Sequence, residues 1–293
     1  MKHKLTGAGI AIVTPFKTDL SVDHGALTRI VNFNIENGMD YIVIAGTTGE
    51  SVTITSAEKQ AIINTIVTAN NKRVPLVLGI GGNNTAAVIA EIQETDFSDI
   101  DAILSVSPYY SKPTQAGISA HFEAISKVSP KPIILYNVPG RTGSNMLPQT
   151  IIALANSCTN IVAVKEAAGN MGQYLRLLND KPTEFMVISG DDDLALPVTL
   201  AGGSGVISVI GQAFPKDFAQ MIHLGLEGKN KEAFKLHNKL MDITNFIFSE
   251  NNPSGIKAVL NAMKLCQSTV RLPLVEATDE LKKTITGFVN TYA

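Results

Sequence analysis

The sequence predicts an α/β fold, a (β/α)8 TIM barrel, followed by a C-terminal helical extension. Eight short apolar runs recur along the chain, segments with helix-start signals separate them, and no such run follows residue 228. Each run is almost continuously apolar rather than alternating, which is typical of parallel strands covered on both faces. Eight β-then-α units in about 225 residues favour a closed barrel over an open doubly wound sheet.

The predicted strands matter most at their C-terminal ends, because the active sites of such barrels lie there and in the following loops. They span Gly9–Val13, Tyr41–Ala45, Leu76–Gly79, Ala102–Val106, Ile133–Tyr136, Ile161–Val164, Phe185–Ser189 and Gly205–Val209. Polar residues at these ends are therefore the first candidates for chemistry.

The predicted helices between the strands begin at capping residues. Thr55 and Glu58 are spaced as an N-cap and an acid in the first turn, and Pro148 suits a first helical turn. The acids Asp191–Asp193 precede another helix, and we interpret them as helix-start residues that favour the dipole. The expected helices begin at Thr55–Glu58 and cover residues 26–36, 86–94, 115–126, 149–155, 194–200 and 216–226.

The remainder of the chain predicts about three helices, over residues 230–248, 253–264 and 278–291. No composition shift or flexible linker precedes them. We therefore expect a catalytic barrel over residues 1–227 and an extension over residues 228–293. The extension should pack on the barrel or on a neighbouring subunit.

Composition excludes several classes of protein. Of the 293 residues, 45% are hydrophobic, and the formal net charge is −2 without a basic stripe, so nucleic acid is not an expected partner. Cys158 and Cys266 make no disulfide framework. No apolar stretch reaches the ~18 residues of a membrane span, and Pro15 interrupts the N-terminal apolar run. We expect a cytoplasmic protein that has no contact with a membrane.

Lys165, which closes the sixth apolar run, is the most informative residue of the sequence. Lysine is almost never fully buried unless it is paired. A lysine that is desolvated at a strand end can lose its proton, and the neutral amine then attacks ketones to form a Schiff base. Alternatively, the side chain reaches solvent or pairs with a carboxylate. The residues at the other strand ends decide between these two interpretations.

Two further strand ends carry hydroxyl groups. Thr47 and Thr48 lie between glycines after the second run, where hydroxyl and N–H groups can face a carboxylate. An ordinary polar loop is the alternative. Tyr109 and Tyr110 lie between prolines after the fourth run, where a phenol can relay protons. Packing or a subunit interface explains them equally well.

Tyr136 ends the fifth run, and Arg141 follows it. Arginine suits bidentate recognition of a carboxylate, although a salt bridge within the loop is the alternative. Asp191–Asp193 could suggest a divalent metal, but their place before a helix already explains them, so we expect no metal. The five histidines fall outside every strand end, which argues against histidine or zinc chemistry.

Three motifs together resemble a known superfamily. They are Gly46–Glu50 (Gly-Thr-Thr-Gly-Glu), Tyr136–Thr142 (Tyr-Asn-Val-Pro-Gly-Arg-Thr) and Val164–Ala167 (Val-Lys-Glu-Ala). Their order and spacing are those of the pyruvate-dependent class I aldolase-like barrels, the N-acetylneuraminate lyase superfamily. Within it, the chain resembles the dihydrodipicolinate synthase (4-hydroxy-tetrahydrodipicolinate synthase) family over nearly its whole length.

The resemblance implies a lyase of lysine and diaminopimelate biosynthesis that condenses pyruvate with L-aspartate 4-semialdehyde. It implies a covalent imine with pyruvate and no cofactor, and a homotetramer built as a dimer of dimers. Two alternatives remain: an aldolase of 2-keto-3-deoxy acids or 4-hydroxy-2-oxoglutarate, and a non-catalytic barrel that senses a small molecule.

The resemblance also implies a role for individual residues. Lys165 would form the Schiff base, and Tyr136, Thr47 and Tyr110 would form a proton relay. Tyr110 would reach into the site of a neighbouring subunit. Thr48 and the backbone near Ile207 would hold the pyruvate carboxylate. Arg141 would bind the carboxylate of the semialdehyde, and Gly190 would line the pocket.

Many family members are inhibited by lysine at a site on the dimer interface. The matching positions here are Ser51, Val52, Asn83 and Tyr109. Inhibited members typically carry two histidines and a glutamate where this chain has Ser56, Lys59 and Ala87. Loss of the acid removes a partner for the ammonium of lysine, and Lys59 adds a like charge. We therefore expect a vestigial effector site with weak or absent feedback inhibition.

Overall fold

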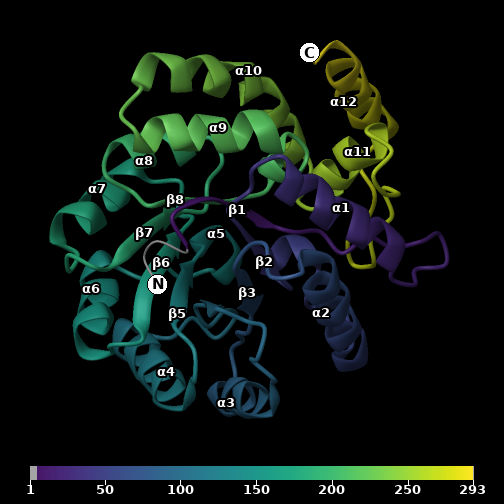
Figure 1. Ribbon diagram of the computed structural model, residues 1–293. Helices are drawn as coiled ribbons and strands as arrows, with labels where there is room; N and C mark the ends of the chain where they lie inside the picture. Colours follow the sequence, from purple (N-terminus) through teal and green to yellow (C-terminus); the bar gives the residue numbers. More distant parts are fainter. Residues whose placement is uncertain (1–4, 293) are drawn as a thin grey trace.

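Eight parallel strands close into one barrel in the computed structural model, which describes residues 5–292 (Figure 1). The strands are β1 (Gly7–Ala11), β2 (Tyr41–Ile44), β3 (Leu76–Gly79), β4 (Ala102–Val106), β5 (Ile133–Asn137), β6 (Ile161–Glu166), β7 (Met186–Ser189) and β8 (Gly205–Ser208). Strands that follow one another along the chain are neighbours in the barrel, and β8 pairs with β1. The predicted fold class is confirmed.

A ring of helices covers the outside of the barrel (Figure 1). These are α1 (His24–Glu36), α2 (Ser56–Asn70), α3 (Thr85–Glu94), α4 (Gln115–Val128), α6 (Pro148–Ser157), α7 (Met171–Asp180), α8 (Ala195–Leu200) and α9 (Pro215–Leu226). The loops after three strands contain short helical turns: η2 (Thr47–Gly49), α5 (Pro139–Thr142) and η3 (Ile210–Gln212). As predicted, Thr55 and Glu58 begin α2, where they form a reciprocal capping box.

Helix α7 was absent from the predicted helices, although the structure places it between β6 and β7. Its start is marked by Asn170, whose side chain accepts a hydrogen bond from the Gln173 N–H. Asparagine is a good N-cap residue, so a signal was present in the sequence.

The inside of the barrel is filled by side chains rather than by solvent. Tyr41 crosses it, and its hydroxyl donates to the Val206 carbonyl at 3.0 Å. A Cβ atom on Gly9 would lie 2.2 Å from the ring of Tyr41, so this position needs glycine. Because side chains alternate along a strand, Ala163 and Lys165 of β6 both face the inside, and Val164 faces the helices. Lys165 therefore lies at the C-terminal end of a tightly packed barrel interior.

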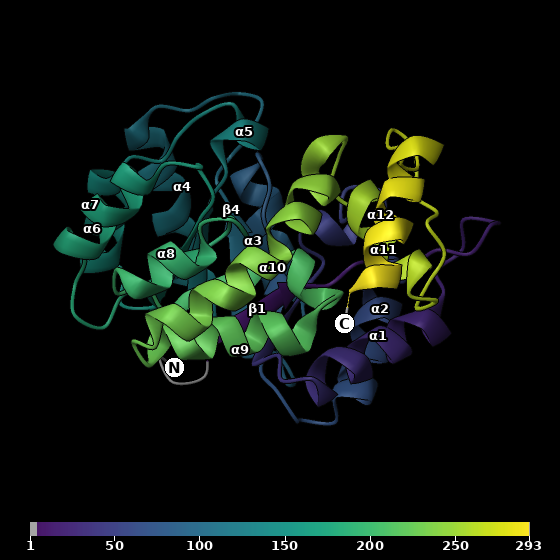
Figure 2. The same ribbon diagram turned by 90° about the horizontal axis from the view of Figure 1, so that it is seen from above.

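The extension packs against the barrel of its own chain. Its helices are α10 (Asn230–Ser249), α11 (Ser254–Ala262) and α12 (Asp279–Thr291). Figure 2 shows α10 lying along α9, and α11 with α12 over the side that carries α1 and α2. The division into domains at residues 227 and 228 stays a prediction. Within residues 5–292, no helix has the length and apolar character needed to cross a membrane.

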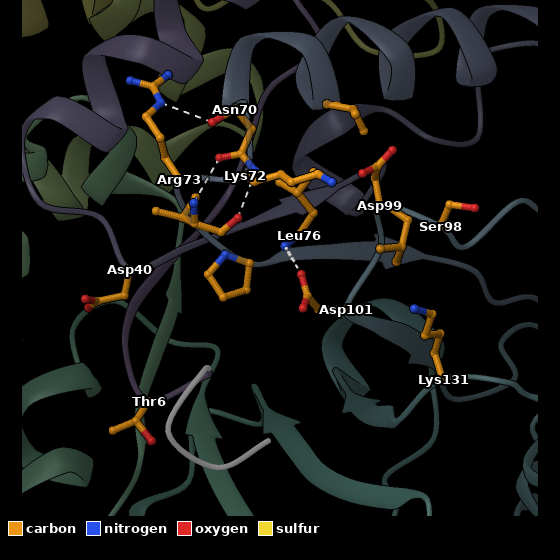
Figure 3. A pocket seen from close by; sticks show the side chains of 14 residues that line it. Thr6, Asp40, Asn70, Lys72, Arg73, Leu76, Ser98, Asp99, Asp101 and Lys131 are labelled. Atoms are coloured by element: carbon orange, nitrogen blue, oxygen red, sulfur yellow. Dashed lines mark hydrogen bonds between the residues drawn. The ribbon is translucent and has the colours of Figure 1, made fainter.

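A cavity of about 580 Å³ lies at the N-terminal ends of the strands, opposite Lys165 (Figure 3). Its charged lining residues are Asp40, Lys72, Arg73, Asp99, Asp101 and Lys131. Acids and bases are balanced there, and the Asp101 carboxylate accepts the Leu76 N–H at 3.1 Å. In barrels, this end contributes stability rather than chemistry.

His223 gives this end of the barrel a pH-dependent contact. The carboxylate of Asp40 accepts the Ala8 N–H at 2.7 Å and contacts His223 Nε2 at 2.7 Å, and this hydrogen bond raises the pKa of His223. The contact therefore stabilises the fold fully below pH ~6.5, and this stabilisation is lost as the pH rises through the raised pKa. Both side chains are partly exposed, so the contribution is at most about 1 kcal/mol.

We expect His223→Gln to lower the melting temperature at pH 5.5 by at most about 3 °C. At pH 9 the variant and the unchanged protein should melt together, because His223 is then neutral. Thermal melts at the two pH values test this. Equal differences at both values would show that the charge of His223 contributes nothing.

Candidate functional site

A cavity of about 640 Å³ lies at the C-terminal ends of the strands, and Lys165 is at its floor. The side chain of Lys165 is 5% exposed, so the amine is largely desolvated. The structure brings together at this cavity most of the predicted site residues, from several strand ends: Thr47, Thr48, Tyr136, Arg141, Lys165 and Gly190.

Tyr136 and Lys165 are direct neighbours across two strands. The register of β5 and β6 pairs them, and both face the inside of the barrel. Lys165 Nζ lies over the ring of Tyr136, 4.5 Å from the centroid. The amine of Lys165 and the ring of Tyr136 are therefore in direct contact, and a protonated Lys165 is attracted to the face of the ring.

Thr47 and Thr48 lie on the tight turn η2 after β2. The turn is closed by hydrogen bonds from the Gly49 N–H to the Gly46 carbonyl and from the Glu50 N–H to the Thr47 carbonyl, at 3.1 and 3.0 Å. Asn252 donates to the Thr48 hydroxyl at 3.0 Å. The hydroxyl of this threonine is thus oriented by a residue of the extension.

Gly190 makes room for the side chain of Lys165. A Cβ atom on Gly190 would lie 3.0 Å from Cε of Lys165 and 2.7 Å from Cβ of Ala167. Any side chain there would displace the stem of the lysine. The predicted place of Gly190 in the pocket therefore has a steric reason.

A buried polar pair lies behind Tyr136 and Lys165. Asn137 and Glu166 are the next residues in the same register, and they face away from the barrel interior. Asn137 Nδ2 lies 3.0 Å from both carboxyl oxygens of Glu166, and Gln173 donates to Oε2 at 2.9 Å. Burial raises the pKa of Glu166 to about 7, although these hydrogen bonds oppose the shift. Sequence reasoning missed this pair, although the alternation of side chains on adjacent strands could have revealed it.

The acids Asp191–Asp193 precede α8 as predicted, but the capping role predicted for them is wrong. The N-cap of α8 is Leu194, and no side chain caps the helix. Asp192 instead accepts the N–H groups of Val209 and Ile210, at 3.0 and 2.9 Å, and so fixes the end of β8. Burial raises the pKa of Asp192 to about 6, against the effect of these hydrogen bonds and of the charge on Lys165.

Asp191 is also engaged in the structure. Its carboxylate accepts the Gly169 N–H at 3.0 Å and the Tyr174 hydroxyl at 3.1 Å. Burial raises the pKa of Asp191. Over the part of the chain that the structure describes, no group of three or more His, Cys, Asp or Glu residues is arranged to hold a metal ion.

The C-terminal extension forms one wall of the cavity. This wall could not be predicted by searching for polar residues at the C-terminal ends of the strands. The residues involved are Thr244, Asn245, Phe248, Ser249, Asn251 and Asn252. Arg141 approaches the same wall, with Nη2 3.5 Å from the Asn252 carbonyl. The sequence offered no signal for this wall, because its residues belong to no strand end.

Two predicted residues do not line the cavity. Ile207 is fully buried in the barrel interior, and Val209 lines the cavity in its place. Tyr110 is 89% exposed, with a left-handed backbone (φ 68°). The roles predicted for Ile207 and Tyr110 stay predictions.

A second cavity, of about 340 Å³, adjoins the first and shares Thr47 and Tyr136 with it. Its lining includes most of the positions that match the effector site: Ser51, Val52, Ser56, Lys59 and Tyr109. Lys59 Nζ contacts Glu91 at 2.5 Å and donates to the Gly79 carbonyl at 2.9 Å. An acid therefore lines this cavity, one turn beyond Ala87, but its charge is already paired.

Asn83 lies at the margin of this second cavity. Its side chain donates to the Tyr109 carbonyl at 3.3 Å and so ties the turn after β3 to the tyrosine loop. The predicted effector residues are thus close together, although Asn83 does not line the cavity.

Comparison with known proteins identifies the family. Residues 4–291 match the model of the dihydrodipicolinate synthetase family. The chain belongs to this family. The 4-hydroxy-tetrahydrodipicolinate synthase of Flavobacterium psychrophilum is 55% identical over 96% of each chain. This match confirms the expected enzyme class, a lyase of lysine biosynthesis. It favours the synthase over the alternative aldolase of 2-keto-3-deoxy acids or 4-hydroxy-2-oxoglutarate.

Solved structures of this family have the same architecture. A chloride-inhibited dihydrodipicolinate synthase of Acinetobacter baumannii in complex with pyruvate is 35% identical, with a TM-score of 0.95, over 98% of each chain. An enzyme of Cyanidioschyzon merolae with lysine bound is 38% identical, with a TM-score of 0.93, over 97% of each chain. The barrel and its helical extension are thus both family features.

Proposed function

We propose that this chain condenses pyruvate with L-aspartate 4-semialdehyde to give 4-hydroxy-tetrahydrodipicolinate through an imine on Lys165. The observation that carries the proposal is the desolvated amine of Lys165, held against Tyr136 at the floor of a cavity at the barrel mouth. Membership of the dihydrodipicolinate synthetase family supports the choice of substrates.

The reaction begins when the neutral amine of Lys165 attacks the keto carbon of pyruvate and water leaves. The resulting imine withdraws electrons, so a proton of the pyruvate methyl group is lost to the Tyr136 relay and an enamine forms. The enamine attacks the aldehyde of the second substrate. The amino group of that substrate then displaces Lys165, which closes the ring and frees the enzyme.

The turn η2 suits the carboxylate of pyruvate. Thr48 is 2% exposed and lines the cavity that holds Lys165. A hydroxyl and turn N–H groups in such a place bind an anion without a counter-charge. Thr47 lines both cavities, which agrees with a place in the relay between Tyr136 and a group arriving from outside.

Tyr110 would complete that relay from a neighbouring subunit. Its exposed ring and left-handed backbone leave it outside the cavity of its own chain. We infer a homotetramer built as a dimer of dimers, located in the cytoplasm, which acts on small molecules without an external cofactor. Cross-linking and mass photometry test the assembly.

Activity with both substrates tests the proposed function directly. Formation of 4-hydroxy-tetrahydrodipicolinate from pyruvate and the semialdehyde is the expected result. Retro-aldol cleavage of a 2-keto-3-deoxy acid at a higher kcat/KM would favour the alternative aldolase. Absence of any pyruvate adduct would favour a non-catalytic sensor.

Arg141 is expected to determine the specificity for the second substrate. It lines the mouth of the cavity beside Asn252, where a guanidinium can bind the carboxylate of the semialdehyde. We expect Arg141→Ala to raise the KM for the semialdehyde roughly 10- to 100-fold, as for loss of a charge-assisted hydrogen bond, and the KM for pyruvate less than about 2-fold.

Steady-state kinetics with each substrate varied in turn measure these effects. Arg141→Lys keeps the charge but loses the planar fork, so it should give an intermediate KM. Equal increases in both KM values would instead show that Arg141 maintains the shape of the site and does not bind the semialdehyde specifically.

Lysine should inhibit this enzyme weakly or not at all. The ammonium of a bound lysine would need Glu91, which Lys59 already neutralises. Lys59→Ala frees that carboxylate and should increase sensitivity to lysine. Activity measured against millimolar lysine, for the unchanged protein and for the variant, tests both statements. Strong inhibition of the unchanged protein would contradict the expectation.

A further inference from the structure

Glu50 and Lys257 form an ion pair that is completely shielded from solvent. Lys257 Nζ lies 2.5 Å from Oε1 of Glu50, and both side chains are 0% exposed. Taking two charges out of water is costly, and an apolar pair of the same volume is often equally stable. The pair joins residues that are 207 positions apart in the sequence, and the proposed reaction uses neither of them.

The extension supplies the partners of Glu50. Lys257, on α11, donates to Oε1, and the backbone N–H of Arg271 donates to Oε2 at 3.0 Å. Lys257 is itself held by the Thr269 carbonyl at 2.8 Å and by the ring of Phe16, 4.2 Å from the centroid. The carboxylate of Glu50 is therefore fixed in direction as well as in charge.

The backbone of Glu50 completes the turn that carries the two threonines. Its N–H donates to the Thr47 carbonyl at 3.0 Å, and its φ of 54° is left-handed. Such a conformation is uncommon for a residue other than glycine and persists where the surroundings hold it. Two side chains of the extension thus bind the turn η2: Lys257 contacts Glu50, and Asn252 donates to Thr48.

We propose that Glu50 and Lys257 are positioning residues for the binding of a 2-oxo acid. Their buried pair fixes the turn η2 so that Thr47 and Thr48 face the carboxylate of pyruvate. The inference rests on the proposed function, since it assigns the turn to pyruvate. It makes the extension a part of the active site, although the extension contributes no reacting atom.

A double-mutant cycle separates positioning from stability. Lys257→Met alone leaves a buried, unpaired carboxylate, so the melting temperature should fall markedly. The double variant E50Q/K257M contains no buried charge and should regain most of that loss. Its KM for pyruvate should nevertheless be at least 10-fold higher than that of the unchanged protein, with the KM for the semialdehyde within 3-fold.

Borohydride trapping provides a second measurement on the same variants. At saturating pyruvate, the double variant should still be labelled at Lys165, because its defect is in binding and not in imine chemistry. Lys282→Met serves as the control, since it breaks the exposed ion pair with Glu276 in the same extension. It should leave both KM values unchanged.

A double variant that regains its melting temperature and keeps the original KM for pyruvate would overturn the proposal. Should that variant not fold, Glu50→Asp decides, because it keeps the charge but shortens the side chain by one methylene. A raised KM for pyruvate in Glu50→Asp supports positioning, and an unchanged one overturns it. Failure of the unchanged protein to trap pyruvate would instead sink the proposed function itself.

Discussion

Lys165→Ala should lose covalent capture of pyruvate completely, and kcat/KM should fall by roughly ten-thousand-fold or more, as when an enzyme loses its nucleophile. The reason is chemical: no other amine is held over Tyr136 at the floor of the cavity in the part of the chain that the structure describes. Intact-protein mass spectrometry after treatment with pyruvate and borohydride measures the adduct. Peptide mapping of the unchanged protein should place it on Lys165.

The matched control is Lys127→Ala, which removes an exposed lysine of α4. This control should be labelled as the unchanged protein is. A Lys165→Ala variant that is labelled to the same extent would show that another lysine carries the imine. The fold should survive the change, because a small apolar residue fits the barrel interior beside Ala163.

Tyr136→Phe has the second largest expected effect, a fall in kcat of about 100- to 10,000-fold, because general acid–base catalysis contributes that much. The ring that holds the amine of Lys165 is retained, so pyruvate should still be trapped, but more slowly. Pre-steady-state trapping and steady-state kinetics measure the two effects, and a thermal melt checks the fold. An unchanged kcat would remove Tyr136 from the relay.

The strands could be predicted because parallel strands buried on both faces must be apolar throughout. That pattern located β3 and β4 to the residue, and it missed only the ends of the others. β6 shows the limit: it continues through Lys165 and Glu166, since polar side chains are tolerated at a strand end that faces a cavity or a polar network. Helix α7 was missed although its N-cap, Asn170, was visible in the sequence.

The site could be predicted only as far as it lies at strand ends. Tyr136 and Lys165 belong to strands, and Thr47, Thr48 and Arg141 follow them closely. Asn252 lies 204 residues from Thr48 in the sequence, in a loop that does not follow a strand. Only the folded structure brings the two side chains together.

The acids after β7 show a different limit. Asp192 was assigned to a helix start by its position, yet its carboxylate serves the end of β8. A side chain that binds backbone N–H groups of the next element leaves no local pattern in the sequence. Glu166 is different: its partners are the side chains of Asn137 on β5 and Gln173 on α7, and the alternation along β5 and β6 does indicate the first of them.

The contacts between the extension and the turn η2 have a consequence for synthesis on the ribosome. The strands and helices of the barrel, residues 7–226, are complete before any residue of the extension is made. Until Asn252, Lys257 and Arg271 have left the exit tunnel, Glu50 lacks these partners, and the turn that is proposed to bind pyruvate is not held. Under the proposed function, the ability to bind pyruvate therefore arrives only with the last part of the chain.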